Sequence, residues 1–542
     1  MSLSPGEGPL TPAQAPRGRP RRAAPWIAGA LVVALVILGT ALATAPPGAV
    51  LPRDPAGGID LPLVADESEA LTPRQVAAFD PFRFDPEREE ELVERGRDGY
   101  EHPLYVKSPG GVEAAAARTG GYRGRVQSAA AGNGVNANTL EAILFLESGG
   151  RPEVIAGDDP ENAVGLAQIL PSTATDLLGM SVDLPRSQRL TRRIDRDRRR
   201  VVTARTARAR REAAIRVREL SRERRRIDDR FNPTRSIGAA ARYLAIAGER
   251  FGREDLAAVS YHMGMGNLED VVEDYVAPRR PRRRPSRTVS AYDLSYARLF
   301  YDSGPRRNRA AFERLASFGD DSRTYLFRVE AAKEIMRLQR GDPRELRAVT
   351  ELHLAKASAE EVLRPASDTE VFDDSVALRE AYEDAELVPL PSDPGRLGFR
   401  IDRRLGELAR SIDTPRELYS GLRPEALATL LFVAKETRLQ TGDETALLLT
   451  SGVRDRPYQR LLVATNPEAT ENYSLHTTGY AFDIALPRSE RRRDAVVGVL
   501  ERLRSLRVVD FVFEPAAIHV TVGPDAEELL PLYEGLIPPE PR

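Results

Sequence analysis

Residues 134–150 read GVNANTLEAILFLESGG, and this stretch carries the signals of one complete helix. Asn138 can cap its start, and Glu141 follows three positions later as the second half of a capping box. The apolar face consists of Leu140, Ile143, Leu144 and Leu146. A Gly-Gly pair ends the helix, so its last turn holds Glu147 among apolar neighbours and at the negative end of the helix dipole. Both surroundings raise the pKa of a carboxyl group, and a carboxyl that stays protonated at neutral pH is what a general acid requires.

The composition limits what the rest of the chain can be. Its 542 residues predict two or three domains, each able to bury a core. The chain has no cysteine, which excludes disulfides, thiolate metal sites and a cysteine nucleophile, so any metal must use His, Asp or Glu. The formal net charge of -2 gives no case for nucleic acid as a partner, although arginine crowds residues 186–230.

An apolar segment near the start predicts a membrane span. Residues 26–45, WIAGALVVALVILGTALATA, contain no charge over about 20 residues, the length a helix needs to cross a bilayer. Four arginines lie just before it, so the positive-inside rule predicts that everything after residue 45 lies outside the cytoplasm. A cleaved signal peptide is the alternative, because Ala43 and Ala45 form an A-x-A pattern. We expect the uncleaved anchor; cleavage would change attachment but not compartment.

Three further segments, taken together with residues 134–150, form an ordered set of motifs. They are VGLAQILPSTA at 164–174, IGAAARYLAIAGERFGREDLAAVSYHMGMGN at 237–267 and SRTYLFRV at 322–329. Together they resemble the motifs of the soluble lytic transglycosylase family, which read E-S, then G-L-M-Q-x-x-P-x-T-A, then A-Y-N-A-G, with a closing tyrosine segment. Ala167 replaces the usual methionine of the family, and His262 replaces its asparagine.

This resemblance implies a lysozyme-like helical domain that cleaves the MurNAc–GlcNAc bond of peptidoglycan. It implies that Glu147 is the catalytic acid and then base, giving a 1,6-anhydro product without consuming water, while Gln168, Tyr261 and Tyr325 bind the substrate. The alternative is a purely structural role, in which Gln168 and Tyr261 contribute only to the packing between helices.

Between the second and third motifs lies an arginine-rich insertion, residues 186–230. It has strong helix formers throughout and few apolar positions, which predicts one or two polar helices projecting into solvent. The functional alternative is a contact with anionic envelope polymers or lipid headgroups.

The C-terminal part contains a second candidate site. In YSLHTTGYAFDIAL, residues 473–486, the odd separation of His476 and Asp483 would place them on opposite faces of one straight strand. Gly479 can allow a turn that brings both side chains to one point. A catalytic zinc needs about three protein ligands, and His519, in the strand-like AAIHVTV, is the candidate for the third.

These residues resemble the zinc D-alanyl-D-alanine carboxypeptidase and dipeptidase family, whose signature S-x-H-x-x-G-x-A-x-D is complete in residues 474–483. The resemblance implies zinc as the cofactor, with His476, Asp483 and His519 as ligands, and Arg454 in SGVR as the residue that steadies the substrate carbonyl. The family places its general base, a glutamate, three residues before the last histidine. Here Glu514 lies five residues before it, so only a bulge or loop could return it to the metal.

The predicted fold is a mainly α, lysozyme-like transglycosylase domain and a smaller α+β zinc-peptidase-like domain behind an N-terminal transmembrane helix. The predicted boundaries are a cytoplasmic basic tail at 1–25, the anchor at 26–45, a tether and lead-in at 46–114, the transglycosylase-like domain at 115–340, a helical connector and Pro-rich linker at 341–420, and the carboxypeptidase-like domain at 421–535.

Both resemblances point to one polymer. We therefore expect a bifunctional, peptidoglycan-processing enzyme that is anchored by a single span in the bacterial cytoplasmic membrane, with its bulk in the periplasm or wall space. The alternative is a cell-wall-binding scaffold in which one or both catalytic sites are degenerate.

Overall fold

The computed structural model describes residues 73–276, 284–355, 360–365, 367, 369–442, 446–465 and 474–537. The predicted basic tail at 1–25, the predicted anchor at 26–45 and most of the predicted tether lie outside these residues. Among the residues described, none of the helices is both long enough and apolar enough to span a bilayer.

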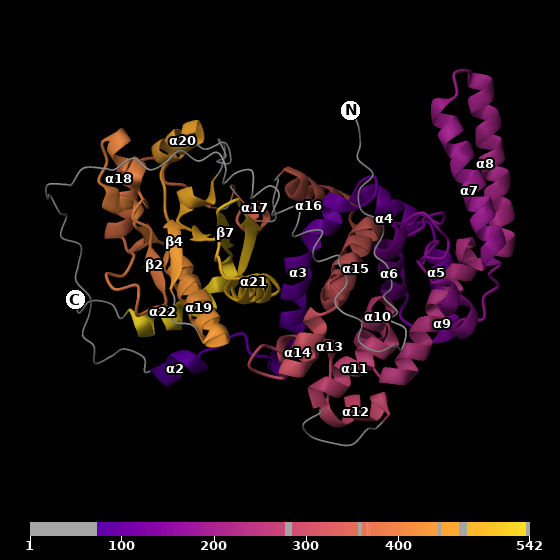
Figure 1. Cartoon of the computed structure of the whole chain (residues 1–542), viewed down its shortest axis with the longest axis horizontal. Helices are drawn as coiled ribbons and strands as arrows, with labels where there is room; N and C mark the ends of the chain where they lie inside the picture. Colours follow the sequence, from indigo (N-terminus) through magenta and orange to yellow (C-terminus); the bar gives the residue numbers. More distant parts are fainter. Residues whose placement is uncertain are drawn as a thin grey trace. The chain divides into compact units, whose positions relative to one another are not determined.

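The chain divides into two compact units (Figure 1). In the described residues, unit 1 is Phe84–Ala355, and unit 2 is the chain after residue 355 together with residues 73–83. The boundaries therefore differ from the prediction. The described part of the predicted tether is largely helical and belongs to both units, and the predicted connector at 341–420 is divided between them as well.

Unit 1 is helical. Its α-helices are α3 (Glu89–Lys107), α4 (Val112–Gly120), α5 (Arg123–Asn133), α6 (Ala137–Ser148), α7 (Leu184–Thr203), α8 (Ala207–Ile227), α9 (Pro233–Phe251), α10 (Glu254–Met263), α11 (Met265–Val276), α12 (Pro285–Tyr292), α13 (Tyr296–Tyr301), α14 (Arg309–Ala316), α15 (Tyr325–Gly341) and α16 (Pro343–Ala355). Short 3-10 turns are η1 (Pro86–Arg88), η3 (Asp229–Phe231) and η4 (Asp321–Thr324), and η2 (Thr173–Leu177) is a π-turn. Helix α6 is central, because it packs against α4, α5, α9 and α15.

Helix α6 is the helix predicted from residues 134–150, but its start differs in detail. Asn136, not Asn138, is the N-cap, and its side chain accepts hydrogen bonds from the backbone of residues 138 and 139. The predicted capping-box residue Glu141 is instead fully buried and pairs with Arg123 and Arg340. The end is as predicted, because Gly149 takes the left-handed conformation with φ of 55°.

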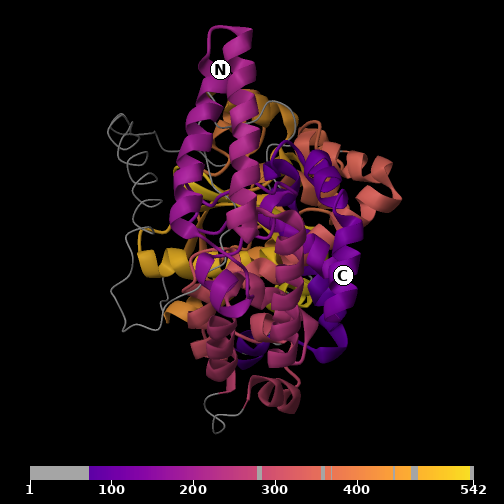
Figure 2. The same cartoon turned by 90° about the vertical axis from the view of Figure 1, so that its right-hand side faces the viewer.

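The arginine-rich insertion forms a hairpin of α7 and α8, which Figures 1 and 2 show side by side, extending beyond the other helices of unit 1. A small apolar seam of Leu190, Ile194 and Leu220 joins the two helices. The base is held by buried polar contacts. Arg230 is fully buried, donates to both carboxylate oxygens of Asp228 at 2.9 and 2.8 Å, and bonds to the carbonyl oxygens of Pro160, Asn162 and Ile169.

Unit 2 contains a five-stranded sheet in the order β2–β4–β5–β7–β6, in which β2 runs parallel to β4 and the other neighbours are antiparallel. The strands are β2 (Phe399–Ile401), β4 (Leu447–Ser451), β5 (Ala481–Ala485), β6 (Val509–Phe513) and β7 (Ala517–Val522). A separate two-stranded ladder joins β1 (Val388–Pro389) to β3 (Gly421–Leu422).

The helices of unit 2 are α2 (Pro73–Ala78), α17 (Glu360–Leu363), α18 (Ser375–Glu383), α19 (Pro424–Thr441), α20 (Arg456–Thr465), α21 (Glu490–Arg504) and α22 (Leu530–Leu536), with 3-10 turns η5 (Glu407–Ile412), η6 (Arg416–Tyr419), η7 (Leu475–Thr478) and η8 (Pro524–Leu529). Helix α19 is buried on all sides and packs against α21, α22 and α2.

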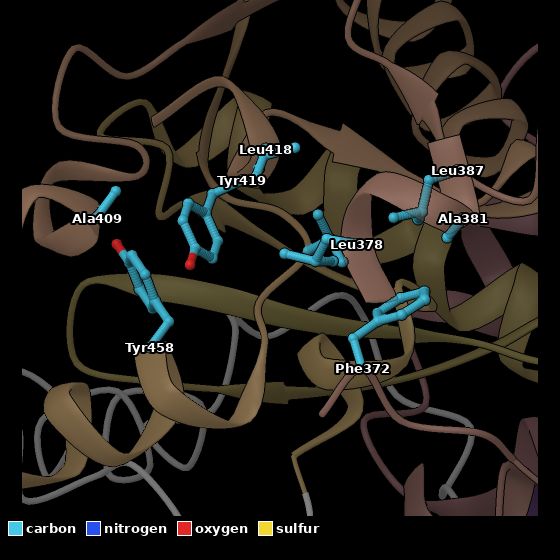
Figure 3. Close-up of a cluster of buried hydrophobic side chains, with 9 residues drawn as sticks. Phe372, Leu378, Ala381, Leu387, Ala409, Leu418, Tyr419 and Tyr458 are labelled. Carbon is cyan, nitrogen blue, oxygen red and sulfur yellow. The ribbon is translucent and has the colours of Figure 1, made fainter. Parts of the chain in front are cut away.

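The Pro-rich segment 388–398, predicted to be an interdomain linker, belongs to unit 2. It contributes β1 and leads directly into β2, an edge strand of the main sheet. The preceding residues are also part of this unit, because Phe372 and Leu378 pack into a buried cluster with Tyr419 and Tyr458 (Figure 3). The linker prediction was wrong because proline and glycine are compatible with a short edge strand as well as with a free segment.

Candidate active site and candidate metal centre

Glu147 lies in the last turn of α6 and is fully buried. Its Oε1 accepts a hydrogen bond of 2.8 Å from the hydroxyl of Tyr325, the first residue of α15. Burial raises the pKa of Glu147 to about 8, although the Tyr325 hydrogen bond and the charge of Arg328 act in the opposite direction. The carboxyl group is therefore protonated at neutral pH, as the sequence led us to expect.

The second carboxyl oxygen of Glu147 has a different environment. Oε2 is buried and has no hydrogen-bond partner among the described residues. Because Oε1 already accepts from Tyr325, Oε2 is the oxygen that can carry the acidic proton. Glu147 thus holds one acidic proton, and no acceptor among the described residues forms a hydrogen bond with it.

His262 supports this arrangement from behind Tyr325. The two rings stack with centroids 4.8 Å apart, and Nδ1 of His262 lies 3.0 Å from the Ser322 hydroxyl. Burial lowers the pKa of His262 below its usual value, so the ring is neutral. The sequence singled out His262 only as a departure from the family pattern; its contact with Tyr325 could not be seen, because the two residues are 63 positions apart.

Gln168 and Tyr261 line one pocket, together with Ile169, Leu170, Thr173, Leu178, Tyr243 and Gly264. The pocket has a cavity volume of about 20 Å³, room for about one water molecule. The Tyr261 hydroxyl donates to the carbonyl of Ala167 at 2.7 Å, and Gln168 has the unusual φ of 46° for a non-glycine residue. Its Nε2 donates to the Gly165 carbonyl, whereas its Oε1 is buried without a partner among the described residues. This site therefore has an unused hydrogen-bond acceptor.

Glu147 does not line this pocket, but it lies near it. Its charge raises the pKa of Tyr261, in addition to the larger effect of burial, so the two side chains are electrostatic neighbours. Because Glu147 is fully buried, a sugar can reach it only after a side-chain movement. Tyr243, which packs edge-on against Tyr261 with centroids 5.0 Å apart, is a pocket residue that sequence reasoning missed. No motif marks it.

In unit 2, the sheet brings three predicted ligands together. Asp483 on β5 lies directly opposite His519 on β7, so both side chains point to the same face. His476 lies on η7, just before β5, and the chain turns between them at Gly479 with φ of 78°. A Cβ at residue 479 would lie 2.8 Å from Leu387, so the turn accepts only glycine without rearrangement. The turn predicted at Gly479 is confirmed.

The three ligand atoms form a compact triangle. Nε2 of His476 lies 3.2 Å from Oδ1 of Asp483 and 3.1 Å from Nδ1 of His519, and the last two atoms are 2.8 Å apart. These atoms form a group suited to hold one metal ion. Ligands at about 2.0 Å from a tetrahedral zinc are about 3.3 Å apart, so the triangle would need to open by about half an ångström at most.

The tautomer of His476 also fits a metal. Its Nδ1 lies 2.8 Å from the carbonyl oxygen of Gly452, which can only accept, so Nδ1 carries the proton and Nε2 keeps its lone pair. A histidine ligand is usually fixed in this way by a hydrogen bond to its other nitrogen. The donor set of two imidazoles and one carboxylate is one that zinc prefers.

The electrostatics keep these groups in the state that binds metal. Burial, followed by the charge of Arg454, lowers the pKa of His476 to about 4. Burial alone would raise the pKa of Asp483, but the charges of the two histidines and their hydrogen bonds lower it well below its usual value. At neutral pH the site thus offers a neutral imidazole and a carboxylate.

Arg454 lies beside the triangle, and its side chain is 12% exposed. Its guanidinium donates to the Ser451 hydroxyl at 2.6 Å, to Gln459 at 3.1 Å and to Oδ2 of Asp483 at 3.3 Å. A register shift in β4 places Ser451 opposite Asp483, on the same face of the sheet. Nε of Arg454 has no partner in the described part of the chain, so this group can still donate one hydrogen bond.

Glu514 occupies the hairpin between β6 and β7. Val512 pairs with His519, so residue 514, two positions further, points to the same face as the metal triangle. Its charge raises the pKa of Arg454 against the larger lowering by burial, so Glu514 is an electrostatic neighbour of the site. The chain reverses between β6 and β7, and the backbone N–H of Glu514 donates to the carbonyl of Ala517 at 3.0 Å.

The comparison with protein families supports one of the two resemblances. A family model described as Transglycosylase SLT domain matches residues 125–191 and 207–278, which include Glu147, Gln168 and Tyr261. Part of unit 1 is therefore similar to the transglycosylase SLT domain, with residues 192–206 of the α7–α8 hairpin outside the match. The match does not extend to Tyr325 or to unit 2. A comparison of the chain with curated proteins found no match.

Proposed function

We propose that unit 1 cleaves the glycan strand of peptidoglycan as a lytic transglycosylase. The observation that carries this proposal is the protonated Glu147, whose Oε2 has no partner among the described residues, within a segment that matches the SLT family. A buried carboxyl group with a raised pKa is the usual form of a glycosidase general acid. Gln168 and Tyr261 line the adjacent pocket and supply the contacts to the sugar.

The chemistry needs only one carboxyl group. Oε2 of Glu147 transfers its proton to the glycosidic oxygen, and the bond to the anomeric carbon breaks. The N-acetyl group of the substrate stabilises the positive charge, as in other substrate-assisted glycosidases. The resulting Glu147 carboxylate, held by Tyr325, then takes the proton of the C6 hydroxyl, whose oxygen closes onto the anomeric carbon. The product is a 1,6-anhydro sugar, and Glu147 is protonated again.

The test is mass spectrometry of purified sacculi after digestion. The wild type should release anhydromuropeptides, whereas Glu147→Gln, which cannot donate and regain the proton, should lose at least the roughly 10²- to 10⁴-fold that general acid–base catalysis supplies. Glu161→Gln, a change at an exposed glutamate of the same unit, is the matched control and should act like the wild type. Sacculi left unchanged by the wild type would instead support the scaffold alternative.

We further propose that unit 2 binds one zinc ion through His476, Asp483 and His519 and hydrolyses stem peptides. The compact triangle of ligand atoms and the fixed tautomer of His476 support this proposal. When bound, zinc would supply a Lewis acid and an activated water. Arg454 orients the peptide carbonyl through its free Nε–H, and Glu514 accepts the proton of the attacking water.

Metal content tests this site independently of activity. Zinc measured by inductively coupled plasma mass spectrometry should be about one ion per wild-type chain and near zero for His476→Ala. Glu514→Gln should retain the metal but lose hydrolysis of a D-Ala-D-Ala peptide. If Glu514→Gln keeps full hydrolysis, Glu514 has no role as base. If the wild type binds no zinc, unit 2 is not a zinc peptidase.

The proposed location is the outer side of the bacterial cytoplasmic membrane, with the apolar segment 26–45 as a single-pass anchor. The sequence of that segment and the extracytoplasmic substrate of the SLT family support it. Deletion of residues 26–45 should move the protein from the membrane fraction to the soluble fraction. Retention of the deleted chain in the membrane fraction after a wash with 0.5 M salt, which releases charge-dependent contacts, would count against the anchor.

A further inference from the structure

The α7–α8 hairpin carries a positive charge that the structure does not neutralise. Residues 184–227 contain eighteen arginines and five acidic residues, an excess of thirteen positive charges. Several arginines are exposed and form no ion pair with any described residue: Arg189, Arg192, Arg193, Arg196, Arg199, Arg205, Arg211, Arg218, Arg222 and Arg226. Like charges four positions apart, as at residues 192 and 196, destabilise a helix. An anionic partner would remove this repulsion between the arginines, so the charge pattern favours such a partner.

The tip of the hairpin adds an apolar feature. Val202, in the last turn of α7, is 82% exposed, more than any other large hydrophobic side chain among the described residues. Arg199 and Arg205 flank it in sequence and are exposed. A soluble anionic polymer would bind the arginines but would leave Val202 in water. A bilayer surface suits both, because lipid phosphates bind guanidinium groups and the boundary below them accepts an apolar side chain.

We propose that the tip of the α7–α8 hairpin docks on an anionic lipid bilayer. The arginines bind the headgroup phosphates, and Val202 enters the interface between headgroups and acyl chains. Val202, Arg199 and Arg205 lie in the part of the hairpin that the SLT family match omits, residues 192–206. The docking does not depend on the chemistry proposed for Glu147.

The base of the hairpin connects the proposed docking surface to the pocket that contains Gln168. Arg230 and Arg224 are fully buried, and Arg230 bonds to the backbone of residues 160, 162 and 169 around the segment that contains Gln168. Gly165 packs so closely on this base that a Cβ would lie 1.9 Å from the Arg230 carbonyl oxygen. The base of the hairpin is therefore tightly packed on this segment, and α8 with 21 residues is about 30 Å long. If the proposed function holds, docking fixes the pocket at about that height above the bilayer.

The absence of cysteine allows a direct test with the full chain. Val202→Cys labelled with the environment-sensitive dye NBD is reconstituted into vesicles of phosphatidylcholine alone or with one third phosphatidylglycerol. We expect a blue shift and a rise in intensity of twofold or more only in the anionic vesicles, reversed by 0.5 M salt. The same dye on Ser128→Cys, an exposed position on α5, should not respond.

Charge variants show whether the dye response depends on the arginines of the hairpin or on the label alone. Changing Arg199, Arg205 and Arg211 to Gln should remove most of the response, and changing them to Lys should keep it, because the charge is retained. Equal spectra in both vesicle types overturn the proposal. So does an equal response to soluble polyphosphate in the presence of neutral vesicles, which would assign the hairpin to an anionic polymer. Release of anhydromuropeptides by the same samples reports on the proposed function separately.

Discussion

Glu147 of unit 1 and Asp483 of unit 2 are both buried carboxyl groups, yet their pKa values shift in opposite directions. Burial raises the pKa of Glu147 to about 8, whereas the pKa of Asp483 lies well below its usual value. Glu147 receives one hydrogen bond, from the neutral hydroxyl of Tyr325. Asp483 contacts two imidazoles and the guanidinium of Arg454.

The difference shows that the partners of a buried carboxyl group, more than burial itself, determine its charge. One neutral hydroxyl does not compensate for lost hydration, so Glu147 keeps its proton and suits acid catalysis. Several cationic or proton-donating neighbours do compensate, so Asp483 is a carboxylate and suits a metal ion.

The largest effect is expected for the stability of Glu147→Gln. The pKa of Glu147 is higher in the folded than in the unfolded chain, so the folded chain binds the proton more tightly between pH 4.5 and about 8. Wild-type stability therefore falls as pH rises through this window, and Gln removes that loss. We expect the variant to be little changed at pH 4 and more stable by up to about 5 kcal/mol at pH 9.

Hydrogen exchange of the α6 amides at several pH values measures this effect in unit 1 alone. The exposed change Glu161→Gln should give no pH-dependent gain. A constant difference between Glu147→Gln and the wild type from pH 4 to pH 9 would mean that Glu147 titrates normally.

A stability change of comparable size but opposite sign is expected when the buried cation Arg230 is removed. Arg230→Ala leaves the buried Asp228 without its guanidinium and removes the bonds to three carbonyl oxygens. Breaking a buried pair in this way costs about 3 to 5 kcal/mol. Arg218→Ala, at an exposed arginine of α8, should change stability by less than about 0.5 kcal/mol. Urea unfolding of both variants provides the comparison, and equal midpoints would contradict it.

Asp483→Asn tests the other half of the contrast. Asparagine keeps the shape but removes the charge that the two histidines and Arg454 stabilise, and it removes an anionic ligand. Zinc affinity should fall by more than the roughly 10- to 100-fold that loss of an outer-shell partner typically costs. Competition with a chromogenic chelator measures the affinity. Asp393→Asn, at an exposed aspartate of unit 2, is the control and should bind zinc like the wild type.

Most residues of both candidate sites could be named from the sequence because they lie in short motifs. The end of α6, the turn at Gly479 and the pairing of residues 476 and 483 follow from local signals. The helix start was displaced by two residues because Asn136 and Asn138 are equally able to cap, and only the packing of Glu141 against two arginines decides between them.

Long-range contacts could not be predicted. The stack of His262 on Tyr325 and the pocket contact of Tyr243 join residues that are far apart in the chain, and no motif marks either contact. The boundary of unit 2 was missed for the same reason. The short strand β2 is identified only by its pairing with β4, and Phe372 belongs to the unit only through its packing.

The smallest effect is expected for Tyr325→Phe, which removes the hydrogen bond to Oε1 of Glu147. That bond lowers the pKa of Glu147, so its loss raises the pKa further. The proposed transglycosylase activity needs the protonated acid, so in the wild type it should fall as pH rises through about 8. In the variant this fall should move to higher pH by up to about one unit, because a hydrogen bond is worth about 1 kcal/mol net.

The pH dependence of anhydromuropeptide release measures that shift. His262→Asn, which restores the asparagine of the family pattern and keeps the Tyr325 hydroxyl, is the matched control, and its alkaline limb should stay at the wild-type position. A shift of Tyr325→Phe to lower pH would reverse the assigned sign. It would mean that the Tyr325 hydroxyl stabilises the protonated form of Glu147, and that burial alone does not keep the acid neutral.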